Sequence, residues 1–218
     1  MSRTPDPVLP SELELPLAFV NTLDVEDAVD RFGSPAALRS WLIDRGLIGS
    51  DARVTRRDLG LAIELRDALR HALIAHAGID SSTHEVAGVN RTLARFPVGV
   101  RVDETGSPQL EPRGAGVAGA LGRVVCDMNA AQSRGTWDRL KLCPAEDCLW
   151  AFFDASKNRS RRWCSMNVCG NRTKTREYRR RRAAHAHAAE GTSGASVEVR
   201  RRVPESTTRE GAGEEASE

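Results

Sequence analysis

The chain has 218 residues, of which 40% are hydrophobic and 28% charged, enough for one medium-sized domain and a small module. No run of about 18 apolar residues occurs, so a membrane span is not expected. The N-terminal segment carries proline and glutamate where a secretory signal would be apolar, and the five cysteines leave one unpaired, so we expect a cytoplasmic protein.

The formal net charge of +2 conceals a strong separation of charge along the chain. Between Lys157 and Arg182 there are eleven Lys and Arg residues and one acid, Glu177, whereas the rest of the chain holds 21 basic and 29 acidic residues. A cationic module joined to an acidic body indicates a polyanionic partner for one part of the chain only.

The first predicted elements follow a proline-rich start, residues 1–11, for which we expect disorder. The apolar residues of segment 13–20 alternate in part, which suits a strand or an extended entry into the core. Ser34 and Pro35 then form a favourable helix start, and Gly46 ends that helix. A second helix begins at Thr55, which can form a capping box with Asp58, and it runs to about Ala77.

A third helix is predicted over residues 82–96, with Val86, Val89, Leu93 and Phe96 facing inward. Residues 98–102 and 109–111 are expected to form a small β-hairpin around a Thr-Gly-Ser-Pro turn. A fourth helix follows over residues 114–134, and Cys126 is placed in its buried face as a small core residue.

Four cysteines come as two equally spaced pairs, Cys143/Cys148 and Cys164/Cys169. Two such knuckles can converge on one tetrahedral ion, and Zn²⁺ suits four thiolates in a closed structural site. Two disulfides are the alternative, but they need an oxidising compartment. A catalytic zinc is disfavoured because no histidine lies between Cys143 and Cys169. We expect loss of the metal to unfold this module and to leave the helical body largely intact.

Several residues of the cysteine module have assigned roles. Gly170 is expected to take a positive φ, and Asn171 to bridge backbone or sulfur groups. Trp150 and Phe153 are expected to pack in a small core, with stacking on nucleic-acid bases as the alternative. Nucleic-acid contact is predicted for nine basic residues, against the alternative of a solvated charged helix: Lys157, Arg159, Arg161, Arg162, Arg172, Lys174, Arg176, Arg179 and Arg180. Arg172 and Arg176 are the candidates for reading bases.

Asn21 and Thr22 are polar residues directly after an apolar run. They could face a ligand pocket or satisfy a buried backbone turn. Of these two roles for Asn21 and Thr22, only the ligand pocket would make the body a sensor of an effector.

The motif Cys169-Gly170-Asn171-Arg172 and the sequence around it resemble the CGNR zinc fingers. The body is similar to the ABATE domain that usually precedes this finger, through the Phe-Val-Asn-Thr run ending at Thr22 and segment 34–47. The resemblance implies a bacterial transcription regulator linked to stress, with a zinc finger that binds DNA. The implied organisation is an ABATE-like domain over 12–136, a finger with its basic helix over 137–184, and a disordered tail over 185–218.

The expected fold class is therefore mainly α with a small β-hairpin (α+β): a helical N-terminal domain followed by a small four-cysteine zinc-finger module. The leading function is a DNA-binding transcription regulator whose finger contacts double-stranded DNA. The helical domain would sense a small-molecule effector or form a homodimer. The alternatives are an RNA-binding or ribosome-associated protein and a zinc-stabilised protein-interaction module. An enzyme is not expected, because no catalytic grouping or phosphate loop is found.

Overall fold

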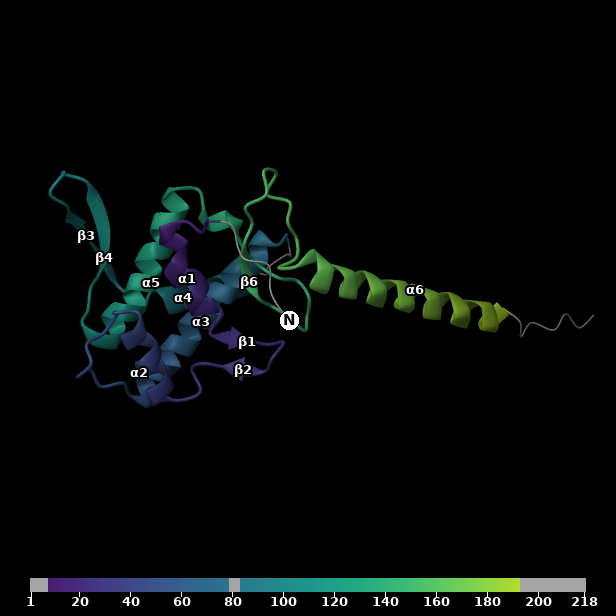
Figure 1. The fold of residues 1–218 in the computed structure, drawn as a ribbon, viewed down its shortest axis with the longest axis horizontal. Helices are drawn as coiled ribbons and strands as arrows, with labels where there is room; N and C mark the ends of the chain where they lie inside the picture. Colours follow the sequence, from purple (N-terminus) through teal and green to yellow (C-terminus); the bar gives the residue numbers. More distant parts are fainter. Residues whose placement is uncertain (1–7, 79–82, 193–218) are drawn as a thin grey trace, which may run out of the picture. The chain divides into compact units, whose positions relative to one another are not determined.

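The computed structural model describes residues 8–78 and 83–192 (Figure 1). The chain forms two compact units, Met1–Thr175 and Arg176–Glu218. Of the residues expected to be disordered, 1–7 and 193–218 lie outside the described residues. The expectation is not met at Ser11, which begins a helix, or over residues 185–192, which continue the helix Asn171–Thr192. Among the described residues, none of the helices is long and apolar enough to cross a membrane.

The elements of the body, in chain order, are α1 (Ser11–Val20), β1 (Leu23–Asp24), β2 (Val29–Asp30), α2 (Pro35–Asp44), α3 (Arg56–His76), α4 (Thr83–Leu93), β3 (Val98–Val102), β4 (Pro108–Pro112) and α5 (Gly116–Ser133). Those that follow are the 3-10 turn η1 (Trp137–Arg139), β5 (Leu140–Leu142), β6 (Ala151–Phe153), the π-helical turn η2 (Met166–Gly170) and α6 (Asn171–Thr192). The fold is thus mainly helical with small two-stranded sheets, as expected. The described residues form three antiparallel hairpins, β1–β2, β3–β4 and β5–β6, whereas the sequence predicted one.

Helix α1 replaces the strand or extended segment expected over residues 13–20. Its buried residues, Leu13, Pro16, Phe19 and Val20, repeat every three or four positions, which is the helical spacing. The alternation in the sequence was therefore misleading, because Leu15 and Leu17 are only partly buried. Asn21 follows as the C-cap, with its backbone N–H donating to the carbonyl of Leu17.

The starts and stops of α2 and α3 are confirmed. The Ser34 hydroxyl accepts from the N–H of Ala37, and Thr55 and Asp58 form the predicted capping box. Gly46 and Gly78 end the two helices with φ of +64° and +73°, a conformation that glycine adopts without strain. The third predicted helix corresponds to α4. The prediction that its Val86 faces inward is wrong, because 47% of the surface of Val86 is exposed.

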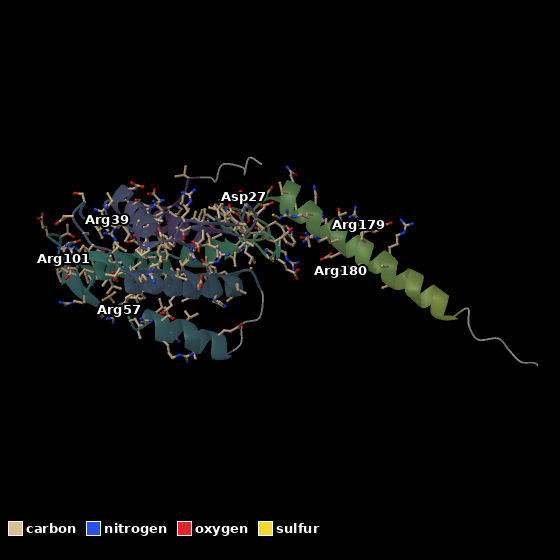
Figure 2. All side chains as sticks on the ribbon, turned by 90° about the horizontal axis from the view of Figure 1, so that it is seen from below. Asp27, Arg39, Arg57, Arg101, Arg179 and Arg180 are labelled. Carbon is tan, nitrogen blue, oxygen red and sulfur yellow. The ribbon has the colours of Figure 1, made fainter. Side chains whose placement is uncertain are left out.

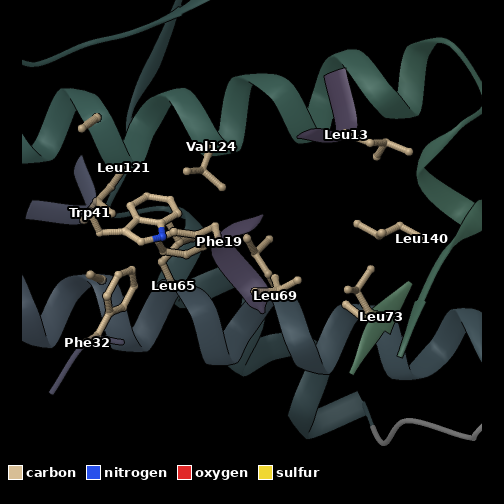
Figure 3. Packing of buried hydrophobic residues seen from close by; sticks show 14 of the residues in the cluster. Leu13, Phe19, Phe32, Trp41, Leu65, Leu69, Leu73, Leu121, Val124 and Leu140 are labelled. Carbon is tan, nitrogen blue, oxygen red and sulfur yellow. The ribbon is translucent and has the colours of Figure 1, made fainter. Parts of the chain in front are cut away.

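The core lies between α1, α2, α3 and α5 (Figure 3). At one end Phe19, Phe32 and Trp41 pack edge to face or tilted, with ring centroids 5.5–5.7 Å apart. At the other end Leu13 and Leu73 meet Leu140 of β5. Cys126 is buried, as predicted. The core therefore continues into the hairpin that carries the first cysteine pair, and the expected boundary at residue 136 runs inside one compact unit.

Candidate metal centre and basic surface

The four paired cysteines come together in space. The sulfur atoms of Cys143, Cys148, Cys164 and Cys169 all lie within 4.8 Å of one another, and all four residues are buried. The Sγ–Sγ distances of Cys148–Cys164 and Cys164–Cys169 are each 3.5 Å. A tetrahedral Zn²⁺ with Zn–S bonds of about 2.3 Å spaces its sulfurs about 3.8 Å apart. The donor set therefore fits one zinc ion in a closed structural site.

The first knuckle is the loop that connects β5 to β6. The N–H of Cys143 donates to the carbonyl of Trp150, and the N–H of Cys148 donates to the carbonyl of Ala145, both at 2.9 Å. Leu149 then takes a φ of +50°, which is unusual for a residue with a side chain. This bend returns the chain into β6 and holds both thiols on the same side of the hairpin.

The second knuckle is the turn η2, which leads directly into α6. The hydroxyl of Ser165 accepts from the N–H of Val168 at 3.4 Å and caps the turn. Gly170 does not have the positive φ that we expected. Glycine leaves space there for two neighbouring side chains, since an added Cβ would lie 2.4 Å from Sδ of Met166 and 3.2 Å from Cδ1 of Trp163 and would require Met166 to move.

The electrostatics of the cluster favour a bound cation. Hydrogen bonds to Cys143 and Cys148 raise the pKa of the Cys164 thiol, and burial raises the pKa of the Cys169 thiol to about 12. Hydrogen bonds with Cys143 and Cys164 lower the pKa of the Cys148 thiol, so one thiolate forms readily, but the neighbouring thiols resist becoming further thiolates beside it. A divalent cation reverses this preference, because it deprotonates and binds the thiols together.

Arg172, the last residue of the CGNR motif, is occupied by contacts within the finger and with the body. Its Nη2 donates to Sγ of Cys169 at 3.5 Å, and its Nη1 donates to Oε1 of Glu26 at 3.0 Å. Its Nε lies 3.3 Å from Oδ2 of Asp147. These contacts place Arg172 as a support of the thiolate and as a link to the β1–β2 hairpin. Asn171 bonds the carbonyl of Asn167 through its Nδ2 at 3.3 Å, within the backbone role expected for it.

Asn21 and Thr22 are engaged by the fold, which favours the buried backbone turn over the ligand pocket as their role. Asn21 Nδ2 donates to the carbonyl of Ala151, and the N–H of Ala151 donates to Asn21 Oδ1, both at 2.9 Å. The Thr22 hydroxyl donates to the carbonyl of Phe19 at 2.8 Å. Asn21 therefore extends the backbone pairing of β6 and joins α1 to the finger.

Two buried arginines of α3 complete this junction, and the sequence analysis missed both. Arg66, 3% exposed, binds Asp30 through two hydrogen bonds of 2.6 and 3.0 Å. Arg70 donates to the carbonyls of Val20 and Leu149, at 3.0 and 2.9 Å. The signal was present, since arginines that interrupt the apolar stripe of an amphipathic helix are candidates for buried charges.

Two regions of the chain match known protein families. Residues 13–131, more than half of the chain, match the family described as "Putative stress-induced transcription regulator" (ABATE). The chain belongs to the ABATE family. Residues 139–182 match the CGNR zinc finger, which contains the four cysteines and confirms the predicted order of the two regions. No curated protein matches the chain.

The loop of the CGNR finger between its two knuckles is built on a buried ion pair, Lys141 with Asp154. Lys141 Nζ donates to Asp154 Oδ2 at 2.6 Å and to the carbonyls of Arg159 and Arg161, at 2.6 and 3.3 Å. The other oxygen of Asp154 accepts from the N–H and hydroxyl of Ser156 at 3.0 and 2.6 Å. This network fixes the backbone that presents the basic residues of the loop.

The basic residues of that loop differ in how free they are to bind. Arg161 packs its guanidinium over the ring of Phe152, 4.9 Å from the centroid, and donates through Nε to the carbonyl of Trp163 at 3.0 Å. Arg159 pairs with Asp138 at the surface. Lys157 and Arg162 are exposed. Arg161 therefore supports the finger itself, whereas the other three side chains reach solvent.

The aromatic residues of the CGNR finger pack in two different cores. Phe152 is 1% exposed and packs with the cysteines, whereas Phe153 is 6% exposed and belongs to the core of the body. Trp150 is half-buried against the cysteine cluster. Core packing is therefore observed for these residues, although Phe153 packs in the body and not in the small core of the finger. Stacking of bases on Phe153 would require the hairpin to leave the core of the body.

Proposed function

We propose that this ABATE protein is a zinc-dependent, DNA-binding transcription regulator. The zinc-bound CGNR finger and α6 contact double-stranded DNA, and the ABATE body senses a small-molecule effector or forms a homodimer. The family descriptions support a zinc-binding regulator. They give no support to an enzyme, and we expect no catalytic activity. A regulator of bacterial genes acts in the cytoplasm, and we propose that location.

The observation that carries the proposal is the character of α6 itself. Every side chain from Lys174 to Ala184 is exposed. Six of the nine residues from Lys174 to Arg182 are Lys or Arg, with Glu177 as the only acid. Figure 2 shows the side chains of Arg179 and Arg180 extending from this helix. Such a helix buries no apolar stripe, and its like charges repel one another. Neutralisation by phosphates, with release of counterions, relieves that repulsion, and a helix of this kind fits the major groove.

The structure changes which arginine we propose as the base reader. Arg172 would have to give up Glu26, Asp147 and Cys169 to reach a base. Arg176, one turn further along α6, has an exposed side chain. We therefore assign base reading to Arg176 and phosphate contact to Lys174, Arg179 and Arg180.

Two features of the body support its proposed role. A cavity of about 480 Å³ lies between α3 and α4, lined by Glu64, His71 and Arg95 among others, and could hold an effector. Val100 and Val102 of β3 expose 62% and 60% of their surface, which favours contact with a second copy.

The test is a salt titration of binding to duplex DNA. Replacing Arg179 and Arg180 by alanine removes two phosphate contacts and should reduce the slope of log K against log salt by about 1.8, since each neutralised phosphate contributes about 0.9. The matched control replaces Arg56 and Arg57, two consecutive exposed arginines that begin α3, and should leave the slope unchanged.

Three outcomes separate the alternatives. Tighter binding of single-stranded RNA than of duplex DNA favours an RNA-binding protein. No binding of either nucleic acid refutes the proposal and favours a protein-interaction module with an acidic partner. If DNA is bound, Arg176→Ala should relax preference at one base pair at a cost of about 1–3 kcal/mol.

A further inference from the structure

A second basic feature lies in the first compact unit, apart from α6. It is a hollow of about 460 Å³ at the point where the end of α3 meets β5 and the loop between the knuckles. Six of the residues that line it carry polar or charged side chains: His76, Lys141, Arg159, Ser160, Arg161 and Arg162. Among the described residues, those that line the hollow include no carboxylate. An anion is therefore the ligand that its chemistry favours.

Among the described residues, the basic side chains of the hollow other than Arg162 have partners of their own. Asp154 neutralises Lys141 in the buried ion pair, and Asp138 pairs with Arg159 at the surface. Arg161 packs on Phe152 and donates to the carbonyl of Trp163, and the lining also includes Arg162. Arg162 is exposed, with its guanidinium 5.6 Å from the ring centroid of Trp163. A guanidinium held beside an aromatic ring keeps its outer N–H groups for a ligand, and its planar fork matches two oxygens of a phosphate.

The hollow is organised before any ligand arrives. Lys141 fixes the carbonyls of Arg159 and Arg161, and Asp154 Oδ2 accepts from the N–H of Arg161 at 2.9 Å. Arg159, which lines the hollow, is held at a φ of +51°, a left-handed conformation that is uncommon for residues other than glycine. Because the backbone is fixed, a ligand needs to order only side chains, which lowers the entropic cost of binding.

The opposite wall is also fixed, by His76. Its Nδ1 donates to the carbonyl of Leu140 at 2.8 Å, because a carbonyl oxygen only accepts, and its ring meets that of Trp137 edge to face. This bond assigns the proton of the neutral ring to Nδ1 and leaves Nε2 as an acceptor for a ligand hydroxyl, or as a donor when the ring is charged.

We propose that this hollow binds a phosphate group, with Arg162 as the principal contact and Arg159 and His76 beside it. The phosphate belongs either to a small phosphorylated ligand, such as a nucleotide, or to the backbone of a bound nucleic acid. The volume is larger than a phosphate alone needs, so it leaves room for the sugar that either source would carry. The site goes beyond the proposed contact between α6 and DNA and does not depend on it.

The experiment uses the full-length, zinc-loaded protein and begins without nucleic acid. Inorganic phosphate and pyrophosphate are titrated by calorimetry into the wild type and three variants, Arg162→Ala, Arg159→Ala and Arg57→Ala. Arg57 is the control, since it is an exposed arginine of α3 that does not line the hollow. A small-ligand site predicts that pyrophosphate binds, that Arg162→Ala weakens binding at least tenfold, and that Arg57→Ala has little effect.

The same variants are then compared in the DNA salt titration. A backbone-phosphate site predicts weak binding of free pyrophosphate and a slope lowered by about 0.9 in Arg162→Ala. The proposal is overturned if pyrophosphate binding is absent or insensitive to Arg162 and Arg159 while the DNA slope is also unchanged. Pyrophosphate binding without any DNA binding would support this hollow and refute only the DNA-binding function. Circular dichroism and zinc content confirm that each exposed substitution leaves the fold intact.

Discussion

Loss of zinc is expected to destabilise the ABATE body as well as the CGNR finger, contrary to the expectation from the sequence. The perturbation is Cys164→Ser or removal of the metal with a chelator. Either change removes the closed four-thiolate site and leaves the two knuckles without the bonds that hold them together. The β5–β6 hairpin carries the first knuckle, and this hairpin is part of the body's core.

The magnitude follows from the burial of that hairpin. Leu140, Leu142 and Phe153 are 0%, 3% and 6% exposed and pack in the main core. Each buried side chain of this size stabilises the fold by about 1.5–3 kcal/mol, so release of all three costs about 4.5–9 kcal/mol. Single domains are stable by only about 5–15 kcal/mol. Separation of the hairpin therefore removes a large share of the body's stability, and the body should unfold more easily without it.

The assay compares zinc-loaded wild type, chelated wild type and Cys164→Ser. Elemental analysis should give one zinc per chain for the loaded protein. Thermal unfolding, followed by far-ultraviolet circular dichroism, should then show the helical signal melting at a much lower temperature without metal. Cys126→Ala is the control, because Cys126 is buried but lies outside the metal group, and it should retain the zinc.

The reasoning is refuted if the chelated protein retains a helical transition at the wild-type temperature while only a small separate transition is lost. That result would mean that the β5–β6 hairpin stays in the core without zinc. It would also mean that the metal organises only the loop and the second knuckle.

Three further predictions concern single residues. Asn21→Ala should cost about 2–4 kcal/mol in urea unfolding, because the buried N–H and carbonyl of Ala151 both lose their partner; a cost below about 0.5 kcal/mol would contradict this. Gly170→Ala should destabilise the finger by about 1–3 kcal/mol while zinc stoichiometry stays at one, because the added methyl displaces Met166; an unchanged melting temperature would show that the methionine moves freely. Burial raises the pKa of the Asp154 carboxyl, but its hydrogen bonds outweigh burial and hold that pKa below its usual value. The ionised Asp154 carboxylate thus contributes its full stabilisation above about pH 4, and this contribution is lost as the pH falls through the lowered pKa. In Asp154→Asn the free energy of unfolding should therefore fall less steeply with decreasing pH in this acidic range.

The local parts of the fold and the metal site could be predicted from the sequence because they depend on neighbouring residues. Ser34 and Thr55 cap helices through bonds that reach only three residues along the chain. The β3–β4 hairpin follows from alternation and a short turn. The cysteine spacing alone indicated a thiolate site, since two short knuckles need only a hairpin between them to converge.

The sequence could not show which polar residues the tertiary structure would bury. Asn21 and Ala151 are 130 residues apart. Nothing in the sequence around either residue indicates that the side-chain amide of Asn21 pairs with the backbone of Ala151 in β6. Arg70 likewise bonds the carbonyl of Leu149 across the core. In both cases the partner is a backbone group, which every residue carries, so the side chain's identity does not reveal where it binds.

The same limit decided the roles of the basic residues. By sequence, Arg161 and Arg172 resemble Arg162 and Arg176, because charge and spacing are all that the chain displays. Folding gives Arg161 the ring of Phe152, and it gives Arg172 the sulfur of Cys169 together with two carboxylates. The sequence by itself thus determined that the finger is cationic and binds a metal. Only the tertiary structure decided which arginines hold the finger together and which reach a ligand, because that depends on the carboxylates, rings and carbonyls that folding brings within a few ångströms.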